Sequence, residues 1–215
     1  MPRIRSRTPV RRIGPLLRYL TETLSRSGCE LLHAAGTRND TFQLSYENPL
    51  LQRVGLTGQL LSLGPHTRDP DGATATIQVA TGPGRTSPCE PDPFGLFTAV
   101  LLGMDPARDL FVAFDPGRHF PEDESLSVSI SGDPLRETLA RDWHAWEREE
   151  WEGEEDDGFA ETLVGFTGPN LVRYVLFERL AVGLDTGPRQ RLAELYFEDV
   201  VRRGGAGKGF RRFPL

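Results

Sequence analysis

Apolar residues near the start of the chain recur with helical spacing. The pattern after Pro15 consists of Leu16, Leu17, Leu20 and Leu24, and Gly28 is a typical stop signal. We therefore expect an N-terminal helix.

In the middle of the chain, alternation of apolar and polar residues replaces the helical spacing. It predicts strands at about 29–35, 41–47, 74–81 and 125–131. The stretch 50–63, LLQRVGLTGQLLSL, fits either a broken helix or a pair of strands. Two continuous apolar runs predict a buried hairpin, at 94–103 and 110–115.

Helical signals return after this hairpin. Asp133 and Pro134 predict the start of a helix that runs to about Trp146. Trp143 and Trp146 would share one face of it, where packing on the sheet is favoured over a cage for a planar base. The acidic stretch after it, at 147–157, predicts a solvated helix end and loop.

The last third of the chain predicts one more strand and two helices. The strand lies at 161–166, a helix capped by Thr167 at about 169–182, and the last helix at about 188–203. Strands gather in the middle and helices at the ends. We therefore predict an α+β fold, with a central, mostly antiparallel sheet flanked by an N-terminal helix and two or three C-terminal helices.

Charge is distributed unevenly along the chain. Residues 1–18 and 202–215 hold 11 of the 25 basic residues and no acidic ones, so the middle, with 14 basic and all 31 acidic residues, carries −17. The net charge of −6 argues against a general nucleic-acid coating protein, but basic ends are compatible with phosphate contact. We expect a disordered basic arm at 1–12, a single domain at 13–203 and a flexible basic tail at 204–215.

The composition predicts a cytoplasmic protein without a membrane segment. No apolar run approaches the roughly 20 residues that span a bilayer, and no secretory signal is expected from the N-terminal pattern. Two cysteines, Cys29 and Cys89, provide neither a disulfide framework nor a set of zinc ligands. We expect no metal and no cofactor.

The residues do not supply a complete catalytic set. A metal-dependent nuclease of the PD-(D/E)XK kind needs a lysine beside paired acids, and the single lysine, Lys208, lies in the tail. The four histidines are scattered singly along the sequence. The tail stretch GGAGKGF lacks the strand, the Ser or Thr and the helix of a phosphate-binding loop. A nuclease is therefore the least favoured of three functional hypotheses.

The stretch LFVAFDPGRHF at 110–120 places Arg118 and His119 on a Pro-Gly turn. Together with ETLVGFTGPNLVRYV at 161–175, it resembles a bacterial module that accompanies restriction-endonuclease-like or methylase-associated defence proteins, often ahead of a nuclease domain. In arrangement the resemblance covers about 16–182. This sequence differs from the module by Pro116-Gly117 in the turn. We also expect no nuclease domain after it, so that any cutting would come from another polypeptide or would not occur.

The resemblance assigns roles to two groups of residues. At the turn it places Phe114, Asp115, Arg118 and His119, and it implies that the last two contact DNA. On the strand-helix unit it places residues that it implies to be structural: Glu161, Phe166, Leu171 and Tyr174.

We therefore predict a non-catalytic DNA-recognition protein, or a subunit of a restriction or phage-defence system, with a separate nuclease or methylase as partner. Reading of a modified or flipped base is an extension of this hypothesis. The basic arm would add salt-sensitive affinity for phosphates. The residues predicted to bind nucleic acid are Arg118, His119, Arg85, Arg3, Arg5, Arg7, Arg11 and Arg12.

The alternative is a protein-interaction or assembly subunit whose acidic body docks on a basic partner without touching DNA. An exposed apolar patch around the last helix would favour this alternative. A deep pocket with converging carboxylates or histidines would favour an enzyme.

Overall fold

The computed structural model describes residues 14–36, 41–65, 75–79, 95–118, 126–130, 132–150 and 159–204. Its helices are α1 (Pro15–Arg26), α2 (Gly132–Arg141), the 3-10 turn η1 (Gly168–Asn170), α3 (Leu171–Ala181) and α4 (Thr186–Gly204). The first five strands are β1 (Glu30–Gly36), β2 (Thr41–Glu47), β3 (Arg53–Pro65), β4 (Ala75–Val79) and β5 (Phe97–Asp105). The others are β6 (Leu110–Phe114), β7 (Leu126–Ile130), β8 (Trp143–Glu150) and β9 (Phe159–Thr167). None of the described helices is long and apolar enough to cross a membrane.

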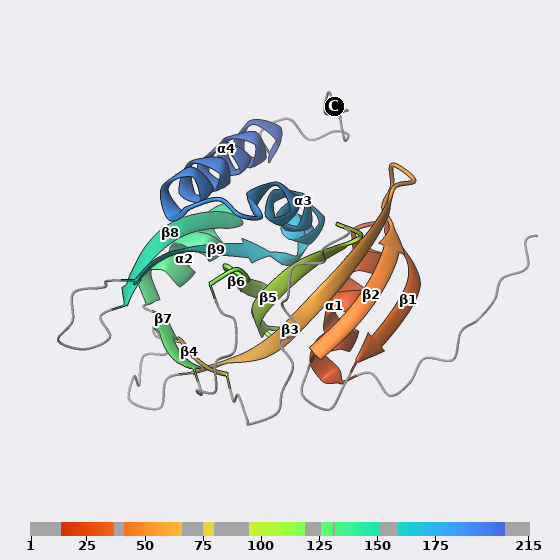
Figure 1. Cartoon of the computed structure of the whole chain (residues 1–215), viewed down its shortest axis with the longest axis horizontal. Coiled ribbons are helices and arrows are strands. Elements are labelled where there is room, and N and C mark those ends of the chain that lie inside the picture. The colour runs from red at the N-terminus through yellow and green to blue at the C-terminus, as the bar shows by residue number, and fades with distance from the viewer. Residues whose placement is uncertain are drawn as a thin grey trace, which may run out of the picture.

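The strands form one mixed sheet with the order β1-β2-β3-β5-β6-β9-β8 (Figure 1). Among the described pairs only β3 and β5 run parallel. The last residues of the long strand β3, from Leu63 to Pro65, pair with β4, and β4 in turn pairs with β7. This confirms the predicted α+β fold with a mostly antiparallel sheet and helices at both ends of the chain.

The two faces of the sheet carry two separate apolar clusters. Along β6, Phe111 and Ala113 join the cluster covered by α1, α3 and α4, which we call the three-helix face. Leu110 and Val112 join the smaller cluster that includes Leu135 of α2, which we call the α2 face. Successive side chains of a strand point to opposite faces. Odd-numbered residues of β6 therefore pack on the three-helix face, and even-numbered ones pack on the α2 face.

Most of the alternating stretches form the strands that were expected. The predicted hairpin is β5 and β6, paired from Leu101 with Phe114 to Asp105 with Leu110. The ambiguous stretch 50–63 is neither a broken helix nor two strands but belongs largely to β3. A Cβ at Gly58 would lie 1.8 Å from the carbonyl oxygen of Val100 on β5, so this close parallel pairing requires glycine.

The predicted helix from Asp133 to about Trp146 is wrong in its second half. α2 ends at Arg141, Asp142 takes a φ of 64°, and β8 begins at Trp143. Pairing with β9 overrides the local helical signal, and the stretch WHAWEREE alternates as a strand does.

The two tryptophans therefore do not share a face. Trp143 packs on the three-helix face and donates a hydrogen bond from Nε1 to the carbonyl oxygen of Ala193 in α4 at 3.0 Å. Trp146 packs on the α2 face. In Figure 1, α4 runs along β8 at the top of the molecule, where it covers this strand.

Two smaller predictions near these elements are only partly correct or only partly tested. Residues 147–150 end strand β8 rather than a helix, and 151–158 lie outside the described residues. Thr167 stands at the N-cap position of η1, which leads into α3, as expected, but its side chain makes no capping hydrogen bond and its hydroxyl donates instead to Asp142 Oδ1 at 2.9 Å.

Candidate functional site

Strand β6 ends at Phe114, and the chain then makes a tight turn over Asp115–Arg118. Asp115 Oδ1 accepts a hydrogen bond from the Gly117 N–H at 2.9 Å, and its carbonyl accepts one from the Arg118 N–H at 3.0 Å. Aspartate first and proline second are favoured at these positions of such a turn. Asp115 therefore fixes the direction in which Arg118 leaves the turn.

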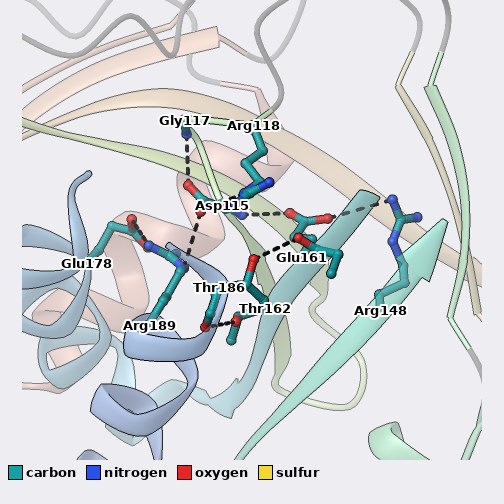
Figure 2. A network of polar contacts seen from close by, with 10 residues as sticks. Asp115, Gly117, Arg118, Arg148, Glu161, Thr162, Glu178, Thr186 and Arg189 are labelled. Atoms are coloured by element: carbon teal, nitrogen blue, oxygen red, sulfur yellow. Dashed lines mark hydrogen bonds and ion pairs between the residues drawn. The ribbon is translucent and has the colours of Figure 1, made fainter. Parts of the chain in front are cut away.

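On the three-helix face, the turn is held by a buried arginine of α4. Arg189 Nε lies 3.7 Å from Asp115 Oδ2, and its two Nη atoms donate to the Glu178 carboxylate at 3.0 and 2.7 Å (Figure 2). The Tyr174 hydroxyl donates to Glu178 at 2.8 Å. Glu178 and Arg189 are each 1% exposed.

On the α2 face, the same turn is held by a buried glutamate of β9. Glu161 Oε1 accepts a hydrogen bond from the Asp115 N–H at 2.8 Å. Glu161 Oε2 lies 3.7 Å from Nη2 of Arg148, its cross-strand partner on β8. The turn is thus fixed through its side chain by one layer and through its backbone by the other.

We call this arrangement the turn network. Its negative and positive groups are equal in number. It contains three carboxylates and three guanidinium groups: Asp115, Glu161, Glu178, Arg118, Arg148 and Arg189. Burial raises the pKa of Glu178, and Arg189 opposes that rise. Burial also raises the pKa of Tyr174 well above its ordinary value, which keeps this hydroxyl a hydrogen-bond donor. Breaking such buried pairs is costly, because the remaining charge is left in the interior.

Arg118 lies at the outer end of this network. Its Nε is 3.9 Å from Asp115 Oδ2, and its side chain is 31% exposed, whereas that of Arg189 is 1% exposed. Arg118 is thus a partly exposed arginine on a turn that buried groups support from both sides of the sheet.

The other residues predicted to bind nucleic acid are not placed by the structure. His119 and Arg85 lie outside the described residues, as do the five arginines of the N-terminal arm, Arg3, Arg5, Arg7, Arg11 and Arg12. Their roles and their proximity to Arg118 stay predictions, as do the arm and tail boundaries.

The residues that the resemblance marks as structural are buried. Glu161, Phe166, Leu171 and Tyr174 are all 0% exposed, and the rings of Phe166 and Tyr174 stack at 4.6 Å. Glu161 differs from the other three, since it is a charged residue that holds the backbone of the turn.

Three members of the turn network were not anticipated from the sequence. Glu178 offered a signal, as an acidic residue within the apolar stretch VLFERLA. Arg148 would have been found by reading the alternation of WHAWEREE as a strand. Arg189 offered no signal, since its partners come from other elements.

The described residues contain no group of three or more His, Cys, Asp or Glu side chains placed to hold a metal. Cys29 is buried, which raises the pKa of its thiol to about 11, so this thiol is not activated as a nucleophile. Cys89 lies outside the described residues.

The fold and the turn network define an α+β protein that presents an arginine on a rigid turn. A family model described as methylase-associated X1 matches residues 60–175, just over half of the chain, and the chain belongs to this family. The match contains the 115–118 turn and Glu161, whereas Glu178 and Arg189 lie beyond its end. Searches of curated proteins and of solved structures gave no match.

Membership of this family confirms the methylase-associated part of the predicted resemblance. It indicates a role linked to restriction–modification and an association with a methylase. The restriction-endonuclease-like part of the resemblance stays a prediction.

Proposed function

We propose that this protein is the DNA-recognition component of a methylase-linked restriction–modification system, and that Arg118 contacts the DNA. The observation that carries the proposal is the contrast between the Arg118 side chain, which is partly exposed, and the buried groups that fix its turn. A guanidinium group can fork onto a guanine edge or a phosphate. Because the turn is already fixed, little conformational entropy is lost on binding.

The neighbouring basic residues complete this proposal. His119 would be a second donor beside Arg118, and Arg85 and the N-terminal arm would reach phosphates. Phosphate contacts give affinity that falls steeply with salt, whereas base contacts give specificity. Reading of a modified base belongs to the same proposal, since a methylase partner would create the mark to be read.

Fluorescence anisotropy with a labelled duplex, methylated and unmethylated, tests the proposal across a salt series. We expect Arg118→Ala to weaken binding by about 1–3 kcal/mol if the arginine reads a base, and to reduce the salt slope by about one if it contacts a phosphate. Arg179→Ala, which removes an exposed arginine near the end of α3, is the matched control. The proposal is wrong if the protein does not bind either duplex at low salt.

A second candidate function is that of a docking subunit for the methylase. Leu180, Val182 and Leu195 are 61%, 56% and 61% exposed at the end of α3, just beyond it and on α4, which is the location expected for an assembly surface. Copurification with the associated methylase tests this function. We expect Leu195→Glu to abolish the complex while duplex binding by the isolated protein is unchanged.

A further inference from the structure

A cavity of about 350 Å³ lies at the opposite end of β6 from the 115–118 turn. The end of α1, the turn that precedes β6 and the start of α3 enclose it, with Arg26, Asp109 and Arg173 among its lining residues. Its volume falls in the lower part of the range of small-ligand sites.

Two guanidinium groups from different helices, those of Arg26 and Arg173, line this cavity. Arg26 is held by its neighbours, since Nη2 donates to Thr23 Oγ1 at 2.8 Å and the guanidinium lies 5.6 Å over the ring of Tyr19. Its side chain is nevertheless 59% exposed. Arg173 stands in the first turn of α3, where Nη1 donates to Asn170 Oδ1 at 3.2 Å. A positioned pair of guanidinium groups is well suited to a phosphate.

The one carboxylate of the cavity is already engaged. Asp109 accepts a hydrogen bond from the Tyr19 hydroxyl and lies 3.4 Å from Arg26 Nη2. Its backbone has a φ of 52°, and a Cβ at Gly168 would lie only 2.6 Å from Asp109 Oδ1. The carboxylate thus occupies the space that a side chain at position 168 would need. Two guanidinium groups and one carboxylate thus line the cavity.

The remaining wall is apolar. Pro169, Val172 and Leu176 line it, and the Ser27 hydroxyl and the Asn170 amide add polar groups at its margin. Such a cavity suits a ligand with an anionic group joined to a flat body that can pack against aliphatic side chains.

We propose that this cavity binds a nucleotide, with its phosphate at Arg26 and Arg173 and its base against Val172 and Leu176. A free mononucleotide and an extrahelical nucleotide of DNA have the same chemistry at this site. The inference goes beyond the proposed function, because it involves neither Arg118 nor any residue of the turn network.

Calorimetric titration of the full chain with deoxynucleoside monophosphates tests the assignment. We expect saturable binding that is about tenfold or more weaker in Arg26→Ala and in Arg173→Ala, since each removes charge-assisted hydrogen bonds. Arg18→Ala and Arg179→Ala remove exposed arginines of the same two helices outside the cavity and should bind as the wild type does. Thermal melting of each variant confirms that it is folded.

A second pair of titrations separates the base from the phosphate. Leu176→Trp should fill the space for the base and abolish mononucleotide binding, while binding of inorganic phosphate is kept. The assignment is overturned if wild-type protein does not bind mononucleotides at millimolar concentration, or if inorganic phosphate binds as tightly as they do.

Competition identifies the source of the nucleotide. If a mononucleotide displaces a duplex with one unpaired nucleotide, but not a fully paired duplex, the cavity takes an extrahelical base; if it displaces neither, the free nucleotide is the ligand. Arg118→Ala should bind mononucleotides normally, so failure of the DNA-recognition proposal and failure of this inference are distinguishable.

Discussion

The two ends of strand β6 differ in how their polar groups are satisfied. At the 115–118 turn, both layers of the protein supply buried partners, Glu161 from the α2 face and Arg189 from the three-helix face. At the other end, Asp109 and Arg26 form an ion pair that is 38% and 59% exposed beside a cavity. Strand β6 thus begins beside a solvent-exposed ion pair and a cavity, which we call the open end. It finishes at a turn held by buried charged groups, which we call the sealed end.

This difference determines how much stability is lost when a charged group is removed at each end. Where both layers close over charged groups, removal of one partner leaves a buried charge without compensation, which is strongly destabilising. Where the ion pair faces solvent, water replaces a lost partner and the pair contributes about 0–1 kcal/mol. Loss of a buried charged partner at the sealed end should therefore cost stability, and loss of an exposed one at the open end should mainly affect binding.

The largest effect is expected for Arg189→Met at the sealed end. It leaves the Glu178 carboxylate buried without the two hydrogen bonds and the positive charge of Arg189, and we expect the free energy of unfolding to fall by about 3–5 kcal/mol in urea titrations. Arg26→Met, the matched change at the open end, should cost less than about 1 kcal/mol. The double variant Glu178→Leu/Arg189→Met should recover part of the loss, and equal losses at the two ends would contradict the comparison.

A smaller loss is expected for Glu161→Gln. The amide oxygen can still accept the hydrogen bond from the Asp115 N–H, but the charge beside Arg148 is removed, so we expect a loss of about 2 kcal/mol. The same variant should loosen the turn and weaken duplex binding. Unchanged stability would contradict a stabilising role of the Glu161–Arg148 pair.

At the open end, Gly168→Ala tests the packing of Asp109. Its Cβ would lie 2.6 Å from Asp109 Oδ1, so the carboxylate must move, and we expect a cost of about 1–3 kcal/mol together with weaker mononucleotide binding. Gly187→Ala in α4, where nothing lies within 4 Å of the new Cβ, is the control and should be neutral or slightly stabilising. The packing argument fails if the two variants melt alike.

The smallest effect is expected for Tyr19→Phe, which removes the hydroxyl that donates to Asp109 and should cost about 0.5–1.5 kcal/mol at neutral pH. Burial and the hydrogen bond to Asp109 raise the pKa of Tyr19 from 10.0 to about 12. Since the folded state holds this proton more tightly, the contribution is present below pH 10 and lost between pH 10 and about 12. Urea midpoints of wild type and variant should therefore converge over this range, and a constant difference would contradict the assignment.

The sequence predicted those parts of the fold in which local pattern and tertiary contacts agree. The α1 repeat of Leu17, Leu20 and Leu24 and the alternation of β2 and β7 are examples. β8 was missed because Asp133-Pro134 does mark the start of a helix, α2. This helix ends at Arg141 because Asp142 takes a positive φ, and no proline or glycine in the sequence indicates that end.

The candidate site was predictable only in part, for the same reason. The Asp-Pro-Gly-Arg turn and its arginine can be read locally. Glu178 and Arg189 meet Asp115 only after α3 and α4 pack on the sheet, and the cavity depends on α1 approaching α3, so no spacing in the sequence indicates either of them.

The most direct test of the central claim is the affinity of Arg118→Ala for the duplex that wild type binds best, measured at one salt concentration beside the stability of both proteins. We expect the affinity to fall about tenfold or more, while the free energy of unfolding changes by less than about 1 kcal/mol, because the Arg118–Asp115 pair is partly exposed. Equal affinities, or a loss of stability comparable to that of Arg189→Met, would contradict a role of Arg118 in DNA contact and would leave it with a structural role only.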